Sequence, residues 1–168
     1  MRYKTLRLAF VALAVAMLAS ACTIYVRPGG FVSDEISLSG VIQDFQPTRG
    51  AGSSYYPGEN VEFRIVTTQS GYVTLTALDP DGRIYVFERN IPVGAGANYL
   101  PLAGARHVYT VNPPRGLQRV RASFTSTATD GNVRYVGRYG DGEWSSAISL
   151  EIRPSPVRDV AETDFYIR

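Results

Sequence analysis

Residues 61–87 have the sequence VEFRIVTTQSGYVTLTALDPDGRIYVF, and this stretch decides the fold class. In residues 61–65 apolar side chains alternate with charged ones, which is the period-two pattern of a half-buried β-strand. At residues 73–77 apolar side chains alternate with threonines in the same period. The turn Asp79-Pro80-Asp81-Gly82 then reverses the chain into residues 83–87, because its final glycine can take a positive φ angle. The stretch therefore predicts neighbouring antiparallel strands joined by a tight turn.

Short segments of the same kind lie on both sides of this hairpin, separated by turns rich in glycine, proline and asparagine. The further expected strands are residues 36–42, 107–111, 118–124, 133–139 and 146–153. Their apolar side chains are expected to face a common core, among them Val120, Ala122, Phe124, Ile148, Leu150 and Ile152. About seven or eight short strands at this spacing predict an all-β fold, a single antiparallel and immunoglobulin-like β-sandwich.

The N-terminal residues have the composition of an export signal. Arg2, Lys4 and Arg7 supply positive charge, and an uncharged run follows over residues 8–21. This run is shorter than the about 20 apolar residues that a membrane-spanning helix needs. Its end, Leu18-Ala19-Ser20-Ala21-Cys22, resembles a bacterial lipoprotein signal, in which the cysteine thiol is acylated. An ordinary cleaved signal that leaves a free cysteine is the alternative.

On this interpretation the chain divides into four parts. Residues 1–21 are a lipoprotein signal peptide, 22–35 a lipid-anchored tether, 36–153 the β-sandwich domain and 154–168 a C-terminal tail. The sequence leaves open whether the tail pairs as a last strand or docks on a partner. Thr23, rather than aspartate, follows the cysteine, which resembles lipoproteins sent on to an outer membrane.

Charge excludes one class of partner. Three of the 17 basic residues lie in residues 1–21 and none of the 15 acidic ones does, so 14 cations face 15 carboxylates in the remainder. A near-neutral domain has no overall attraction to polyanions, and we expect no nucleic-acid partner.

An inventory of reactive groups argues against catalysis. His107 is the single histidine, which excludes a metal site built from several imidazoles of one chain. No serine elbow and no phosphate-binding glycine loop occurs in the sequence. Asp79, Asp81, Asp141 and Glu143 lie in glycine-containing loops, but calcium needs about six to eight converging oxygen ligands. Asp79 and Asp81 are better explained as turn formers. We expect no enzyme activity, no metal and no cofactor.

A family resemblance extends from Tyr56 to Ser123. It is carried by Tyr56-Pro57-Gly58-Glu59, by Ser70-Gly71-Tyr72-Val73-Thr74-Leu75, by the turn at residues 79–82 and by Pro113-Pro114-Arg115-Gly116. These motifs are similar to the bacterial envelope family catalogued as domain of unknown function 4384. The resemblance implies a β-rich accessory domain of exported proteins, and it brings no catalytic residues.

The sharpest binding candidate is residues 133–144, in which arginine, tyrosine and the single tryptophan are punctuated by glycine. Such side chains are enriched at the energetic centres of interfaces. The candidate binding residues are Arg134, Tyr135, Arg138, Tyr139 and Trp144, extended by Arg119 and Arg121 on one face of a strand. The alternative is that Tyr135 and Trp144 close the end of the sandwich while the arginines are solvated.

Two functions follow from these expectations. The first is a non-catalytic, lipid-anchored cell-envelope protein that acts as an accessory or scaffolding subunit of an outer-membrane or surface-layer assembly. Its partners would be the membrane, through the N-terminal lipid on Cys22, and a larger envelope or surface-layer protein. The second is a binding module for a cell-wall glycan or small ligand, with calcium among the alternatives.

Overall fold

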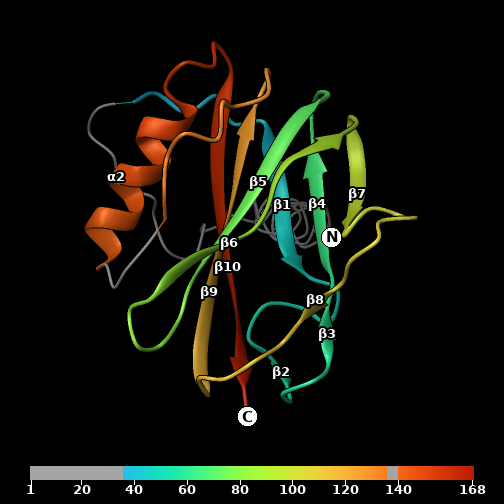
Figure 1. The fold of residues 1–168 in the computed structure, drawn as a ribbon. Coiled ribbons are helices and arrows are strands. Elements are labelled where there is room, and N and C mark those ends of the chain that lie inside the picture. Colours follow the sequence, from blue (N-terminus) through green and yellow to red (C-terminus); the bar gives the residue numbers. More distant parts are fainter. Residues whose placement is uncertain (1–35, 136–139) are drawn as a thin grey trace, which may run out of the picture.

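The computed structural model describes residues 36–135 and 140–168, and in these ranges the chain is mostly β-structure with one helix (Figure 1). The expected signal peptide, Cys22 and the tether lie outside the described residues. The elements are β1 (Ile42–Pro47), β2 (Ser53–Tyr55), β3 (Asn60–Val61), β4 (Phe63–Thr67), β5 (Gly71–Leu78), β6 (Ile84–Val93), β7 (Gly96–Leu100), β8 (Tyr109–Thr110), β9 (Gly116–Thr125), α2 (Asp141–Ile152) and β10 (Arg158–Ile167).

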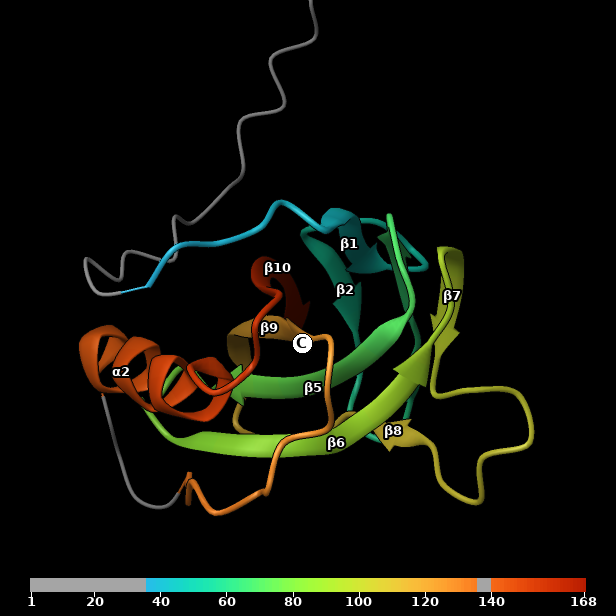
Figure 2. The same cartoon turned by 90° about the horizontal axis from the view of Figure 1, so that it is seen from above.

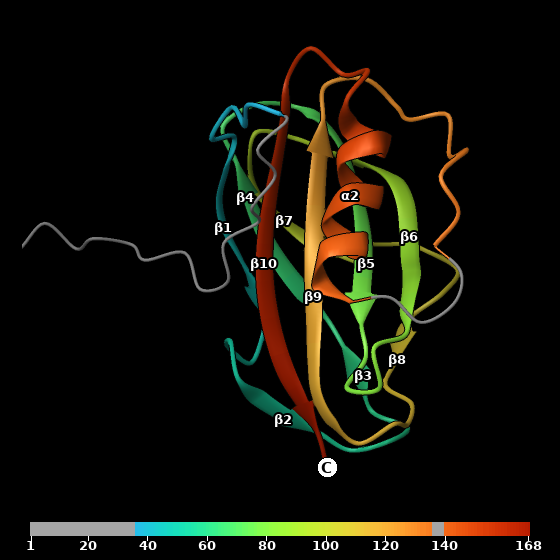
Figure 3. The same cartoon turned by 90° about the vertical axis from the view of Figure 1, so that its left-hand side faces the viewer.

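The strands form a layered structure around one large sheet. This sheet has five strands in the order β2-β10-β9-β5-β6, a second has the order β1-β4-β7, and β3 pairs with β8. Every pairing is antiparallel except that of β10 with β2. The β1-β4-β7 sheet covers one face of the large sheet, and α2 lies on its other face, over β9 (Figures 2 and 3).

Alternation along the strands builds a separate core on each face of the large sheet. On β9, Val120, Ala122 and Phe124 face the β1-β4-β7 sheet, where they pack in one core with Phe63 and Ile65 of β4. The intervening positions of β9 face α2. The core beneath the helix is smaller and contains Leu78, Ile84, Trp144, Ile148, Ile152 and Val160. The helix is therefore part of the folded domain and not an appendage.

The strands expected from period-two alternation are present where one face is buried. Residues 61–65 lie in β3 and β4, residues 73–77 in β5, and residues 118–124 in β9. The turn after β5 leads directly into β6, with a hydrogen bond of 2.9 Å from the amide of Gly82 to the carbonyl of Asp79, and Gly82 has φ of 81°.

Other expected strands are shorter than predicted. Residues 107–111 contribute only Tyr109–Thr110 to a sheet, and the segment 36–42 becomes a strand only at Ile42. Residues 133–135 are not in a strand, and the rest of the expected strand at 133–139 lies outside the described residues. The mostly antiparallel β-structure is thus confirmed. The structure differs from the expected all-antiparallel sandwich in having one helix and one parallel pair of strands.

The strand expected at residues 146–153 is wrong, because this segment belongs to α2. Trp144, Ile148 and Ile152 recur every four residues, so they occupy one face of the helix, and each is at most 1% exposed. Leu150 lies on the other side with 58% of its surface exposed, although alternation placed it in the core. Asp141 and Glu143 in the first turn suit the positive end of the helix dipole.

The segment at residues 154–168, which we expected as a tail, contains an interior strand. β10 pairs along its whole length with β9 and, at its end, in parallel with β2. Phe165 and Ile167 of β10 enter the core between the sheets. The question left open by the sequence is therefore answered in favour of pairing, and the domain continues past residue 153.

Candidate functional site

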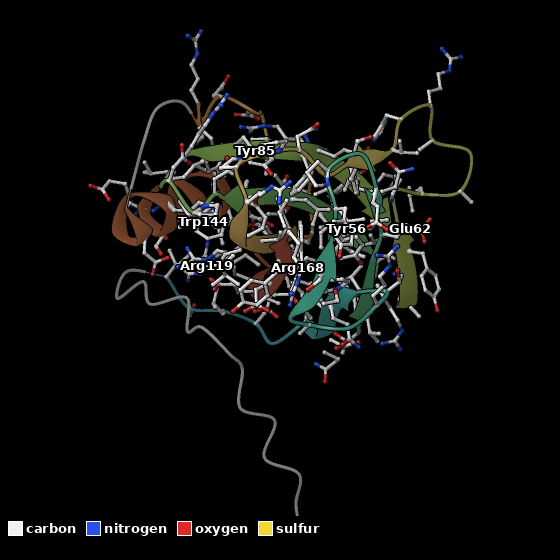
Figure 4. All side chains as sticks on the ribbon, turned by 90° about the horizontal axis from the view of Figure 1, so that it is seen from below. Tyr56, Glu62, Tyr85, Arg119, Trp144 and Arg168 are labelled. Carbon is white, nitrogen blue, oxygen red and sulfur yellow. The ribbon has the colours of Figure 1, made fainter. Side chains whose placement is uncertain are left out.

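Three of the seven expected binding residues, Trp144, Arg121 and Tyr135, are buried. Trp144 is fully buried under α2, and its indole Nε1 donates a hydrogen bond of 2.9 Å to Thr76 Oγ1 of β5. The guanidinium carbon of Arg121 lies 3.9 Å from the centroid of the indole ring, and that of Arg119 lies 5.7 Å from it. Figure 4 labels Arg119 and Trp144. A ligand in solvent cannot reach this ring. The alternative expectation is right that Trp144 is buried, but the two arginines beside it are not simply solvated.

Arg119 and Arg121 share one face of β9, as predicted, but carboxylates of two other elements cover them. Arg121 is 0% exposed, and it donates to Glu162 of β10 at 2.6 Å and to Asp141 of α2 at 2.8 Å. It also donates to Ser145 Oγ at 2.9 Å. Arg119 donates to both oxygens of Glu162, at 2.7 and 2.9 Å. This network attaches α2 to the sheet, so these residues are structural.

The remaining predicted residues divide between the interior, the surface and the part of the chain not described. Tyr135 is buried, and its hydroxyl donates to Glu151 of α2, which also pairs with Arg89 of β6. Burial, together with the charge of Glu151, raises the pKa of Tyr135. Arg134 is exposed. Arg138 and Tyr139 lie outside the described residues.

A cavity of about 600 Å³ opens between β6 and the segment 107–113, at a place that the sequence did not single out. We call it the β6–β8 pocket. Its lining includes Asp79, Arg83, Tyr85, Phe87, His107 and Tyr109. The ring centroids of Tyr85 and Phe87 lie 5.2 Å apart, and those of Phe87 and Tyr109 lie 5.3 Å apart, so aromatic rings form a continuous wall.

A carboxylate holds the two walls of this pocket together. Glu88 of β6 accepts a hydrogen bond of 2.5 Å from the hydroxyl of Tyr109 and lies 2.8 Å from His107 Nε2. Burial and the bond to Glu88 both raise the pKa of Tyr109. The single histidine therefore helps to position the segment that carries Tyr109, which is a structural task.

The most unusual polar group in the pocket is Asp79, at the end of β5. It is 8% exposed and lines the cavity, whereas the side chain of Asp81 accepts a bond of 3.3 Å from the amide of Arg83 in the turn. Burial raises the pKa of the Asp79 carboxyl; Asp81 adds to the rise, and Gln118 and Arg83 partly oppose it. The role of turn former thus fits Asp81 and Gly82, while the Asp79 side chain belongs to the pocket.

A second cavity of about 600 Å³ lies beside α2, next to the segment that we expected to bind a partner. Its lining includes Ile84, Tyr135, Glu143, Ala147 and the exposed Leu150. Among the described residues that line this second cavity, Tyr135 contributes the single aromatic ring. The cavity therefore lacks a wall of adjoining rings like that of the β6–β8 pocket.

Within residues 36–135 and 140–168, no group of three or more histidine, cysteine, aspartate or glutamate side chains is placed to hold a metal ion. The helix in these ranges is too short to cross a membrane.

Comparison with known proteins gives a family match. Residues 54–128 match the family described as "Domain of unknown function (DUF4384)", a segment that contains β5, β6, β8, β9 and the rings of Tyr85, Phe87 and Tyr109. No curated protein and no solved structure matches the chain. Residues 54–128 of the chain therefore form a domain of the DUF4384 family.

Proposed function

We propose that this chain is a non-catalytic, lipid-anchored cell-envelope protein, an accessory or scaffolding subunit that holds a larger outer-membrane or surface-layer protein. The observation that carries the proposal is the β6–β8 pocket. At about 600 Å³ it has the size of a binding site, and its lining combines aromatic rings with a few charged side chains.

The construction of the pocket supports binding. Tyrosine and phenylalanine contribute large contact areas with few rotatable bonds, so they contribute affinity at a small entropic cost. Glu88 fixes Tyr109 and His107 before any ligand arrives. Such preorganisation reduces the cost of ordering side chains on binding.

The N-terminal sequence supports the anchor. The proposed signal peptide ends at Ala21, and acylation of Cys22 would attach the chain to a membrane, with Thr23 favouring the outer membrane. Residues 22–35 can span at most about 50 Å when fully extended, so the domain would stay close to that membrane. A partner held by the pocket would then belong to the same envelope layer.

A cell-wall glycan or a small ligand is the second candidate. Aromatic rings also pack against sugar rings, and the cavity is large enough for a small ligand. This alternative uses the same pocket, but it requires no protein partner.

The proposal predicts that a partner stays bound when the chain is purified from gently detergent-extracted membranes through a C-terminal tag. Mass spectrometry of the eluate should identify one envelope protein in stoichiometric amount. The control is a Cys22→Ser chain, which should be missing from the membrane fraction. A lipidated chain that elutes alone would contradict the accessory role and favour the small-ligand alternative.

A further inference from the structure

We infer that the β6–β8 pocket recognises an alkylammonium group, such as the end of a lysine side chain, through the carboxylate of Asp79 and the surrounding aromatic rings. This inference rests on the proposed function in using the same pocket, and it specifies the chemistry that the pocket selects.

Asp79 is the first step of the argument, because it is a buried carboxylate without an ion pair in the described parts of the chain. Its residue is 8% exposed, and no cationic side chain in these ranges lies within 4.0 Å of its carboxyl oxygens. Arg83 is close enough to influence the carboxyl group but remains exposed at the turn. Removing a carboxylate from water is costly unless a positive charge or hydrogen bonds replace the water.

The neighbour of Asp79 on β9 offsets this cost only in part. Gln118 is fully buried and lies near the Asp79 carboxyl, where it acts to lower the pKa. Neither its amide nitrogen nor its amide oxygen forms a hydrogen bond of good geometry with another described residue. Gln118 is a neutral amide buried behind the residues that line the pocket, so it cannot balance the negative charge of Asp79 as a cation would.

The walls around Asp79 suit a cation as well. Tyr85 lies near enough for the charge of Asp79 to contribute, after burial, to the raised pKa of its phenol. Phe87 and Tyr109 continue the wall from Tyr85. Aromatic faces attract ammonium groups and also pack against the alkyl chain that carries one. An alkylammonium ion would thus find a counter-ion in Asp79 and apolar contact along the aromatic rings.

Calorimetric titration of the full-length, detergent-solubilised protein tests the inference with two ligands of the same length. Pentylamine, which is protonated near neutral pH, should bind at least about tenfold more tightly than pentanol, because only the amine carries the charge. Nα-acetyl-lysine methylamide presents the same group as a protein would. If it binds more tightly than pentylamine, the source is a lysine side chain, and the reverse order indicates a free amine.

Two aspartates of the same turn provide the matched variants. Asp79→Asn should weaken binding of pentylamine at least about tenfold, while Asp81→Asn, at an exposed position, should change it by less than about twofold. Equal losses in the two variants would overturn the inference, since the attraction would then come from the general charge of the turn. Equal binding of pentylamine and pentanol by the unaltered protein would overturn it without any variant.

These results separate the two proposals. If pentylamine does not bind but an envelope protein co-purifies, the ammonium chemistry is wrong and the accessory role stands. If pentylamine binds through Asp79 but the chain elutes alone from membranes, the pocket chemistry stands and the accessory role fails.

Discussion

Replacing Arg121 with methionine should lower the free energy of unfolding by about 3–5 kcal/mol, the usual cost of removing one partner from a buried ion pair. The guanidinium is 0% exposed and joins β9 to both β10 and α2, through Glu162 and Asp141. Its loss leaves Glu162, whose side chain is 7% exposed, with Arg119 as its remaining arginine partner in this network. It also removes the cation that stacks on Trp144.

Arg119 provides the control, because it lies on the same face of β9 and pairs with the same two carboxylates. Its side chain is 27% exposed, so water screens its ion pairs, and Arg119→Met should cost only about 1 kcal/mol. Urea unfolding of the two variants, measured side by side, gives the comparison. Equal losses would show that burial of Arg121 is not what makes the network important.

The second large effect is expected in α2. Ile148→Ala should cost about 2–5 kcal/mol, because it removes a fully buried side chain that packs between the helix and the large sheet. Leu150→Ala should change stability by less than about 0.5 kcal/mol, because Leu150 is 58% exposed. Residues 148 and 150 would share one face of a strand, whereas in the helix α2 they lie on different faces.

Thermal or urea unfolding of these alanine variants therefore distinguishes the helix from the strand that alternation suggested. A similar large loss at both positions is the result that a strand would give, and it would contradict the observed layer formed by α2. A small loss at both would place the segment outside the core altogether.

The reason that α2 escaped prediction can be found in its own residues. Ile148, Leu150 and Ile152 alternate with polar residues over five positions, which imitates a half-buried strand. The helical signal requires a longer window, since it depends on Trp144 four residues before Ile148. By contrast, β4, β5 and β9 were predictable because apolar and polar side chains alternate along them, although β5 and β9 are buried on both faces over most of their length.

The candidate site was less predictable than the fold, because it depends on contacts between distant segments. Sequence alternation placed Arg119 and Arg121 together on a strand, but it could not show that α2 and β10 would cover them. The sequence predicts Asp79 as a turn residue. Its burial depends on the pocket that β6 forms with the distant segment carrying Tyr109, which sequence alternation does not show. The aromatic content of residues 83–87 was the available signal, and it predicted a strand without predicting its exposure to a cavity.

The family match also bears on where function resides. The matched segment, residues 54–128, contains Asp79 and the rings of Tyr85, Phe87 and Tyr109. The helix α2, which includes Asp141, and the strand β10, which includes Glu162, both lie beyond it. A function located in the β6–β8 pocket therefore uses the part of the chain that defines the family.

The central claim, that the β6–β8 pocket holds the partner, is tested most directly by filling its mouth. Val108 and Leu150 are each 58% exposed, and they line the β6–β8 pocket and the cavity beside α2 respectively. Each is changed to tryptophan in the tagged full-length chain, and the amount of co-purifying envelope protein is measured. We expect Val108→Trp to reduce it by about tenfold or more, as loss of a central contact does, and Leu150→Trp to leave it unchanged. Full retention in Val108→Trp, or loss confined to Leu150→Trp, would contradict the account.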